Sequence, residues 1–409
     1  MAVGGNSPIG FTQSRMYMEK NYCIINTGSA SKKYALYRGD TRVFFAHFET
    51  EGGAFVVSIE RGTSERRHIT ETDFINSFEY LLKELASTGV VADPQKHIAG
   101  IGFRIVAPGK YFSEHRLIDD LYVERLRAEK QAAPLHIAPM LLELENVRRL
   151  LPAVSVVGVS DSAFHASLPE RAFTYALAHD VAEKFDIRKF GYHGSSLSSI
   201  VKKTEPLLGR LPARMIVCHL GSGSSITALK DGTSIDTSMG FSPLEGVPMG
   251  TRVGDIDPGA VIRVAAVLKC SLEELEQYFY TRSGLLGISG KSNDIRDLLA
   301  LELQGDMRAK LALDVFVYRI KKYIGAYVAA LGGLDALVFS ATIGERSFII
   351  RERICHGLDV LGIVLDETKN TGVVSRDGFI HKEGSRARIV VMTTDETGEI
   401  ARETRALLG

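Results

Sequence analysis

The most regular hydrophobic pattern in the chain lies at residues 215–229, where two apolar runs flank a turn of glycine and serine. Residues 215–218 lead into the turn at 221–225, and the second run covers residues 226–229. Apolar segments of strand length around a short turn predict a β-hairpin. No helix follows the glycines and no Gly-Lys-Ser/Thr is present, so neither a dinucleotide fingerprint nor a P-loop fits. The turn is either an anion site or an ordinary hairpin beside a buried His219.

The same order of elements recurs at the start of the chain. Residues 21–26 are largely apolar, residues 27–33 read Thr-Gly-Ser-Ala-Ser-Lys-Lys, and a second strand is expected over residues 34–38. Two strand–turn–strand units far apart in one sequence indicate two related domains. Each domain would present a turn that can bind an anion to a shared cleft.

The remaining pattern alternates strands with helices, which predicts an α/β fold. Further strands are expected over residues 42–48, 54–59, 97–106, 154–159, 335–340 and 388–392. Helices are expected over residues 71–86, 117–127, 140–151, 271–280 and 306–331. Residues 341–346 are expected to form a loop directly after a strand.

Four polar residues stand out against this pattern. Arg104 lies inside an apolar strand, where a guanidinium needs an anion or a structural salt bridge. Asp161 follows the strand at residues 154–159, at the kind of strand end where open α/β sheets bind ligands, although it could also cap a helix. His193 lies between two glycines before a helix and is either functional or a satisfied turn residue. Glu396, with Asp395, follows the last strand and could join Asp161 at a divalent ion or be solvated.

Composition narrows the classes of function. The 409 residues suffice for two domains, and the 49 basic residues balance the 49 acidic ones. This balance argues against a nucleic-acid or membrane surface. The four cysteines show no Cys-x-x-Cys spacing, which is typical of reduced thiols and a cytoplasmic protein. Residues 1–20 lack the apolar middle of a signal peptide and are expected to be a flexible leader.

Seven motifs taken together resemble the acetate kinase family of the sugar kinase, Hsp70 and actin superfamily, over residues from about 21 to 408. They are Asn26-x-Gly-Ser-x-Ser-x-Lys33, Ala133-Pro-Leu-His136, Asp161-Ser-Ala-Phe-His165, Gly191-Tyr-His193-Gly, His219-Leu-Gly, Asp236-Thr-Ser-Met-Gly-Phe-Ser-Pro-Leu-Glu-Gly and Met249-Gly-Thr-Arg252-x-Gly-Asp-Ile-Asp-Pro258. The resemblance implies two ribonuclease-H-like (actin-like ATPase) domains with a cleft between them. The N-terminal domain would comprise residues 21–164 and 397–409, and the C-terminal nucleotide- and phosphate-binding domain residues 165–396.

The resemblance also implies an activity: reversible, Mg²⁺-dependent, direct in-line phosphoryl transfer between ATP and acetate or propionate, giving ADP and an acyl phosphate. Such a reaction needs cations and N–H donors around the moving group more than covalent chemistry. By resemblance, Arg104, Asp161, His193 and Arg252 are catalytic, and Asp161 and Glu396 hold the metal. The acyl pocket matches Val106, Leu135, Tyr192 and Pro243. The phosphate and nucleotide site matches Asn26, Ser29, Ser31, Lys33, His219, Leu220, Gly221, Ser222, Gly223, Asp294, Arg296, Thr342, Ile343, Gly344 and Arg346.

Some positions depart from the family pattern. Thr342 stands in place of a glycine in the adenosine loop, Arg346 in place of asparagine, Ser222 in place of asparagine in the phosphate turn, and Tyr192 in place of phenylalanine. A β-branched residue at position 342 narrows the space for adenosine. The chain could therefore use pyrophosphate and phosphate in place of ATP and ADP. A non-catalytic ligand-binding member is a third reading, against which the intact Arg104, His193 and Arg252 argue. The family's homodimer is expected as well.

Overall fold

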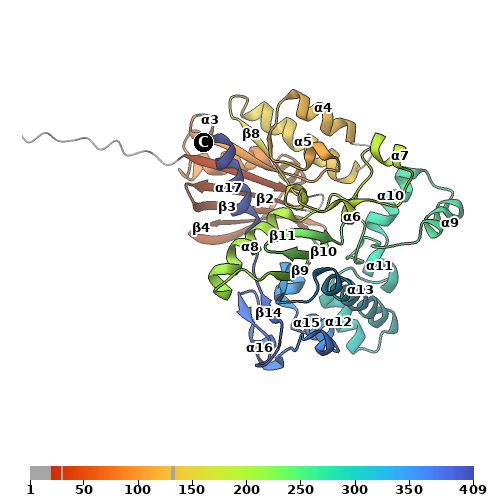
Figure 1. Ribbon diagram of the computed structural model, residues 1–409. Helices are drawn as coiled ribbons and strands as arrows, with labels where there is room; N and C mark the ends of the chain where they lie inside the picture. Colours follow the sequence, from red (N-terminus) through yellow and green to blue (C-terminus); the bar gives the residue numbers. More distant parts are fainter. Residues whose placement is uncertain (1–19, 29–30, 130–133) are drawn as a thin grey trace, which may run out of the picture.

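The chain folds into two mixed β-sheets, each covered by helices, as a computed structural model shows (Figure 1). The structure describes residues 20–28, 31–129 and 134–409, without the side chains of residues 134–136. The predicted leader at residues 1–20 lies outside this description except for Lys20. Within the described residues, the strand order is β5-β4-β3-β2-β1-β6-β8-β7 in the first sheet and β11-β10-β9-β12-β14-β13 in the second. The expected α/β class is confirmed.

The strands of the first sheet are β1 Asn21–Thr27, β2 Ser31–Arg38, β3 Thr41–Glu51, β4 Ala54–Arg61, β5 Thr63–Ile69, β6 Ile98–Ile105, β7 Arg116–Leu117 and β8 Val156–Ser160. Those of the second are β9 Arg214–Leu220, β10 Ser224–Lys230, β11 Thr233–Thr237, β12 Ala336–Ser340, β13 Gly378–Phe379 and β14 Arg388–Val391. The helices before the second sheet are α1 Glu71–Ile75, α2 Ser77–Ser87, α3 Pro94–His97, α4 Asp120–Ala128, α5 Pro134–Leu150, α6 Glu170–Phe173, α7 His179–Lys184 and α8 Gly194–Leu208. Those after β11 are α9 Pro258–Leu268, α10 Leu272–Thr281, α11 Gly284–Ser289, α12 Ile295–Leu303, α13 Met307–Leu331, α14 Ala341–Arg346, α15 Phe348–Cys355, α16 Glu367–Gly372 and α17 Glu396–Leu408.

The two sheets share one internal arrangement, which the repeated sequence pattern predicts. In the first, β1 pairs antiparallel with β2 and parallel with β6, and β6 pairs parallel with β8. In the second, β9 pairs antiparallel with β10 and parallel with β12, and β12 pairs parallel with β14. Each central strand therefore runs into a hairpin turn, and both turns contribute to the same cleft.

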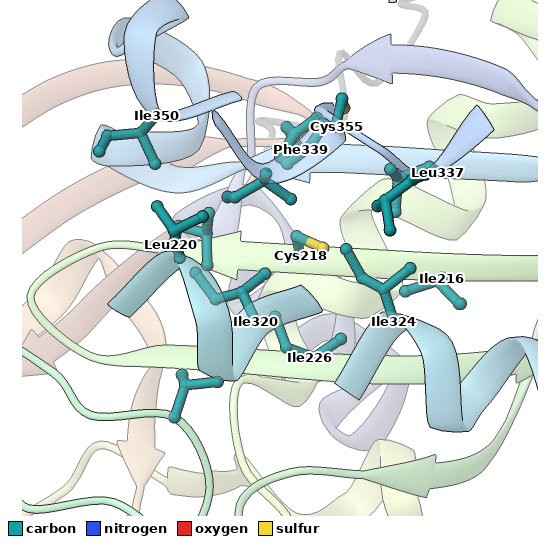
Figure 2. Close-up of a cluster of buried hydrophobic side chains, with 14 of the residues drawn as sticks. Ile216, Cys218, Leu220, Ile226, Ile320, Ile324, Leu337, Phe339, Ile350 and Cys355 are labelled. Carbon is teal, nitrogen blue, oxygen red and sulfur yellow. The ribbon is translucent and has the colours of Figure 1, made fainter. Parts of the chain in front are cut away.

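Alternating side chains give each sheet a separate core on either face. In the first sheet, α2, α4 and α5 pack on one face, and α17 packs on the other. In the second sheet, α13 and α15 cover one face, where Ile320 and Ile324 of α13 lie beside Ile216, Cys218 and Ile226 of the sheet (Figure 2). Helix α8 covers the opposite face and also contacts α17. The C-terminal helix therefore returns to the first sheet as expected, and α8 and α17 join the two halves (Figure 1).

The structure differs from three of the expected elements. The helix expected over residues 71–86 is broken at Asn76, whose amide donates to the Thr72 carbonyl and competes with the helical backbone bonds. The helix expected to begin at residue 117 begins at Asp120, because Asp119 caps its N-terminus. Residues 341–346 form the short helix α14 and not a loop.

Among the described residues, none of the helices is long and apolar enough to pass through a membrane. The domain boundaries near residues 164 and 396 stay a prediction.

The packing of α17 on β6 predicts a loss of stability in Gly102→Ala. The added Cβ would overlap the Thr404 hydroxyl and lie 2.9 Å from Ile400 Cγ2. We expect the free energy of unfolding, measured with denaturant, to fall by about 1–3 kcal/mol. The matched control is Gly325→Ala inside α13, where a Cβ meets nothing within 4 Å. That variant should gain about 0.5–1 kcal/mol. Equal effects of the two substitutions would contradict the packing account.

Candidate functional site

A buried ion pair links the ends of β6 and β8. Asp161, which is 1% exposed, follows β8 and accepts from Arg104 Nε at 3.0 Å and from Arg104 Nη2 at 2.7 Å. Burial alone would lower the pKa of Arg104, but Asp161 and Glu396 raise it above its ordinary value. Arg104 is therefore a fixed cation with a defined orientation.

The ion pair continues into a chain of hydrogen bonds across the cleft. Arg104 Nη1 donates to Asn26 Oδ1 at 3.1 Å, and Asn26 Nδ2 donates to Glu396 Oε2 at 2.9 Å. Ser196 of α8 also donates to Glu396. Burial raises the pKa of Glu396, but Arg104, His219 and Lys33 lower it to about 2. Glu396 is thus ionised, and Asn26 holds it in place.

The same carboxylate of Asp161 positions His193 from the other half of the molecule. His193 has a left-handed backbone with φ 65° at the start of α8, and its N–H donates to Asp161 Oδ2 at 2.8 Å. A non-glycine residue held in this conformation is typical of a functional site. The neighbouring Gly194 N–H donates to the Asp161 carbonyl at 2.9 Å. One aspartate therefore fixes both Arg104 and His193.

The His193 ring is oriented by its own contacts. Its Nδ1 lies 2.9 Å from Ser225 Oγ, and its ring packs on His219 with centroids 4.3 Å apart. Burial, with His219, Arg104 and Arg252 nearby, lowers the pKa of His193 well below its ordinary value, so the ring is neutral at pH 7. If Ser225 donates to Nδ1, Nε2 carries the proton and is a donor toward the cleft.

The glycine turn lies beside this histidine. A Cβ on Gly223 would lie 3.2 Å from His193 Nε2 and 3.4 Å from Arg252 Nη1, so the turn and both side chains converge. His219 is 6% exposed and lies before the turn with Ser340 Oγ 3.5 Å from its Nδ1. His219 is therefore largely buried, and it contributes to the cleft wall together with the turn that follows it.

Arg252 differs from Arg104 in its partners. It forms none of the ion pairs found among the described residues. Its Nη1 lies 3.4 Å from the Pro243 carbonyl, and its guanidinium lies 5.6 Å from the centre of the Tyr280 ring. Burial lowers the pKa of Arg252 from its ordinary value. A partly buried guanidinium that faces a cleft without an acidic partner is suited to binding an anionic ligand.

These groups line one cleft with a volume of about 500 Å³. Its walls include most of the residues that the sequence analysis selects: Asn26, Ser31, Lys33, Arg104, Val106, Asp161, Tyr192, His193, His219, Gly221, Ser222, Gly223, Pro243, Arg252, Thr342, Arg346 and Glu396. The cleft also includes residues that the sequence analysis does not select, namely Arg42, Phe45, Ala341, Glu345 and Thr394. Ser29 and the side chain of Leu135 lie outside the described residues.

Five of the selected residues are not in the cleft wall. Leu220, Ile343 and Gly344 support it from behind: Leu220 is buried at the end of β9, and Gly344 packs against Phe339. Asp294 caps α12 and pairs with Arg296 at 2.6 Å, and the Arg296 side chain is 87% exposed. Arg296 follows two residues after Asp294, the residue that caps α12, so this ion pair forms locally and does not require a ligand.

Val106 and Tyr192 line an apolar corner of the cleft and pack against the buried Met239 and Met249. The Tyr192 hydroxyl donates to the Phe241 carbonyl at 2.6 Å. The hydroxyl that distinguishes tyrosine from phenylalanine is therefore bound to the backbone of residue 241. The corner stays apolar and small, which suits a short alkyl group.

The wall made by α14 carries the two departures at Thr342 and Arg346. They are four positions apart, so both lie on one face of the helix, and both are exposed to the cleft. The Glu345 carboxylate accepts from the backbone N–H groups of Ala341 and Thr394. The buried Arg351 donates to the Gly344 carbonyl at 2.8 Å. These contacts satisfy both ends of α14 and explain why a helix forms here.

The two carboxylates of the cleft, Asp161 and Glu396, are not equally suited to bind a metal ion. Both oxygens of Asp161 accept from the Arg104 cation, whereas those of the ionised Glu396 accept from the neutral side chains of Asn26 and Ser196. Within the described part of the chain, no three His, Cys, Asp or Glu side chains cluster closely enough to hold a metal. Mg²⁺ commonly binds one or two carboxylates together with substrate phosphates and water. The arrangement therefore fits an ion brought by a phosphate ligand to Glu396.

Comparison with known proteins agrees with this geometry. The model of the acetokinase family matches residues 21–402. An acetate kinase of Bacillus cereus is 40% identical over 390 residues, which are 94% of this chain and 98% of that protein. The crystal structure of a propionate kinase from Francisella tularensis is 34% identical with a TM-score of 0.86, covering 95% of this chain and 99% of that one. The acetate kinase of Porphyromonas gingivalis is 32% identical with a TM-score of 0.83, covering 95% and 100%.

These structures confirm the expected actin-like ATPase fold. The family match covers the two sheets and the cleft residues from Asn26 to Glu396. The chain belongs to the acetokinase family, phosphotransferases that use a carboxyl group as acceptor.

Proposed function

We propose that the protein is an acetate or propionate kinase, which transfers a phosphoryl group reversibly and directly between ATP and the short carboxylate. The observation that carries this proposal is Arg252, a cation without an acidic partner that converges with His193 Nε2 and the glycine turn. The apolar corner at Val106 and Tyr192 lies in the same cleft and suits the acid's alkyl group. A phosphoryl group and a short acid can therefore meet among fixed donors.

In the proposed reaction, a carboxylate oxygen attacks the terminal phosphorus of ATP, and ADP leaves from the opposite side. The acid is already ionised at neutral pH, so no protein base is required. Arg104 and Arg252 stabilise the negative charge on the acid and the moving phosphoryl, and His193 donates to a phosphoryl oxygen. The turn at Gly221, Ser222 and Gly223 supplies backbone N–H groups to the donor's phosphates.

Asn26 of β1 and Ser31 and Lys33 of β2 would contact the donor from the first sheet, together with Ser29 of the same motif. Mg²⁺, held by Glu396 and the donor's phosphates, would neutralise phosphate charge and orient the donor. Asp161 is proposed to position Arg104 and His193, because both of its oxygens are engaged by them. Asp294 and Arg296 would border the base and ribose only at the outer end of the site.

A second candidate keeps this chemistry but replaces ATP and ADP by pyrophosphate and phosphate. The α14 wall supports it, because Thr342 and Arg346 face the cleft where the family's pattern has glycine and asparagine. A branched side chain narrows the space for adenosine, and a cation favours a compact polyanion. Thr342 is exposed, however, so a nucleotide can pass it if the ribose keeps to the open side.

We also propose a homodimer that forms through α9. This helix has one charged residue, Arg263, and no buried residue. Its Ile262 is 71% exposed and its Val267 60%, and the following Leu272 is 80% exposed. So large an apolar surface indicates a protein interface, and a second copy of the chain can cover it symmetrically. The helix projects from the body of the molecule (Figure 1).

We also propose a cytoplasmic location, which the four free cysteines support.

The role of Arg252 predicts a large kinetic effect with an intact fold. Arg252→Ala removes a cation that acts mainly on the transition state, so turnover should fall by about 10³- to 10⁵-fold. Steady-state kinetics with acetate and ATP measure the loss, and circular dichroism checks the fold. The matched control Arg171→Ala, at an exposed position of α6, should keep its turnover within about twofold. A loss smaller than about tenfold in Arg252→Ala would remove Arg252 from the chemistry.

The unequal contacts of the two carboxylates predict different responses to magnesium. Glu396→Gln should raise the Mg²⁺ concentration at half-maximal rate by about tenfold or more, because an amide is a weaker ligand for a hard cation. Asp161→Asn should lower the rate with little change in that concentration, because it loses the orientation of Arg104. Titration of activity with Mg²⁺ measures both. The reverse assignment would make Asp161 the metal ligand.

The α14 wall predicts weak nucleotide binding. Overpacking of a fitted site costs about 1–3 kcal/mol, so Thr342→Gly should tighten ATP binding by about 10- to 100-fold. Calorimetry with ATP and with pyrophosphate, followed by activity assays with each donor, tests both candidates. Tight ATP binding by the wild type, unchanged in the glycine variant, would leave an ordinary ATP-dependent enzyme. Turnover with pyrophosphate alone would favour the second candidate.

The α9 interface predicts a change of oligomeric state. Ile262→Asp places a charge in the apolar patch and should convert a dimer into monomers at micromolar concentration. Sedimentation velocity measures the mass. Leu303→Asp on α12, where the side chain is 90% exposed, is the matched control and should leave the mass unchanged. A monomeric wild type would refute the interface.

A further inference from the structure

A second cavity, of about 570 Å³, lies behind the catalytic cleft at the junction of the two halves. We call it the hinge cavity. It is lined by Ser113, Glu114, His115, Val159, Ser160, Ala163, Phe164, Ala166, Gly194, Ser195, Ser198, Glu399, Glu403, Ala406 and Leu407. These residues come from the first sheet, the start of α8 and the C-terminal helix α17, which lie side by side in Figure 1.

The hinge cavity shares its wall with the catalytic cleft. Ser160 and Gly194 line the cavity, while their chain neighbours Asp161 and His193 line the cleft. The Gly194 N–H donates to the Asp161 carbonyl at 2.9 Å, so these two backbone segments are joined. A molecule in the hinge cavity would therefore touch the backbone that positions the catalytic aspartate and histidine, from the side opposite the substrates.

One polar group in this wall lacks a partner. Ser195 is 4% exposed, and within the described residues its buried hydroxyl oxygen has no hydrogen-bond partner. A buried hydroxyl without a hydrogen bond destabilises the fold, and a ligand group that reached it would relieve that cost. Around it, Val159, Ala163, Phe164 and Leu407 provide an apolar lining. The cavity thus combines an apolar body with a polar position, as small-molecule sites do.

The charged groups in the lining are acidic. Glu399 and Glu403 of α17 line the cavity, whereas Lys202 and Arg402, the cations paired with Glu399, are not among the lining residues. His115 Nδ1 accepts from the Ser160 N–H at 3.0 Å, and its Nε2 lies 3.9 Å from Glu403 Oε2. Arg402 Nη2 donates to Glu403 Oε1 at 2.8 Å, but the 3.9 Å separation from His115 is too long for a direct hydrogen bond, so Glu403 Oε2 can accept from a ligand. An ammonium group fits this acidic edge, and a carboxylate or phosphate does not.

We propose that the hinge cavity is a regulatory site for a small amphipathic amine, whose apolar part packs on Phe164 and whose ammonium group binds Glu403. The inference is independent of the proposed substrates, because it concerns different residues. Since the walls belong to both halves of the molecule, an occupant restrains their relative movement. Occupancy therefore changes turnover without competing with acetate or ATP.

The test uses 2-phenylethylamine, with 2-phenylethanol as its neutral isostere, and calorimetry or ligand-observed NMR on the full chain. Ala406→Trp fills the cavity from an exposed position of α17, and Glu403→Gln removes the charge. Ala86→Trp, at an exposed position of α2 outside both cavities, is the matched control. The amine should bind the wild type with a millimolar or lower dissociation constant, roughly what so small a ligand can achieve.

We expect the alcohol to bind at least about tenfold more weakly, because it lacks the ion pair. Ala406→Trp should weaken amine binding by more than about tenfold and Glu403→Gln by about fivefold or more, while Ala86→Trp leaves it unchanged. Saturating amine should change the turnover of the wild type by at least about twofold and that of Ala406→Trp not at all. Failure of the amine to bind, equal binding of amine and alcohol, or unchanged affinity in Ala406→Trp would overturn the site. Binding without any change in turnover would overturn its regulatory role, whichever phosphoryl donor the enzyme uses.

Discussion

The site depends on one buried carboxylate, that of Asp161. Its two oxygens accept from Arg104 of the same half, and one also accepts the backbone N–H of His193 from the other half. A carboxylate that is 1% exposed needs such partners, because an unpaired buried charge costs about 3–5 kcal/mol. The requirement to satisfy Asp161 therefore fixes the guanidinium, the left-handed turn at His193 and the contact between the halves.

This arrangement separates the residues that hold the site from those left for a ligand. Arg104 is neutralised by Asp161, and Asn26 connects it to Glu396. Among the residues that the structure describes, Arg252 has no acidic partner, and the His193 Nε2 next to it faces the glycine turn. Of these two arginines, Arg104 is thus committed to Asp161, and Arg252 is available beside the His193 ring. This difference between the two arginines suits phosphoryl transfer. In that reaction, the negative charge of one group is held in place while the charge that moves on the phosphoryl group is stabilised.

The sequence predicts the parts of the site that rest on local pattern. Apolar runs locate β1, β6, β8 and β9, so the positions of Arg104 and Asp161 at neighbouring strand ends follow from the parallel sheet. The left-handed conformation of His193 depends on a hydrogen bond to a residue 32 positions away and has no local signal. The helix at α14 likewise depends on distant contacts, from Arg351 and the backbone of Thr394.

Other residues were missed because their roles arise from packing. Ser225 and Ser196 read as ordinary turn and helix residues, yet the first orients His193 and the second contacts Glu396. Their hydroxyls acquire these partners only when β10 and α8 meet the cleft. Asp294 and Arg296 are the reverse case. They match the family's motif, but the structure pairs them at the end of α12, away from the cleft wall.

The central claim, that Asp161 acts by positioning Arg104, is tested most directly by a double-mutant cycle on kcat/KM. The cycle compares Asp161→Asn, Arg104→Ala and the double variant with the wild type, and the free energy of unfolding of each variant shows whether it folds. If the two residues act as one unit, the double variant should be less than about tenfold slower than Arg104→Ala alone. Losses that multiply across the two sites would show that Asp161 acts independently of Arg104, and would contradict the account.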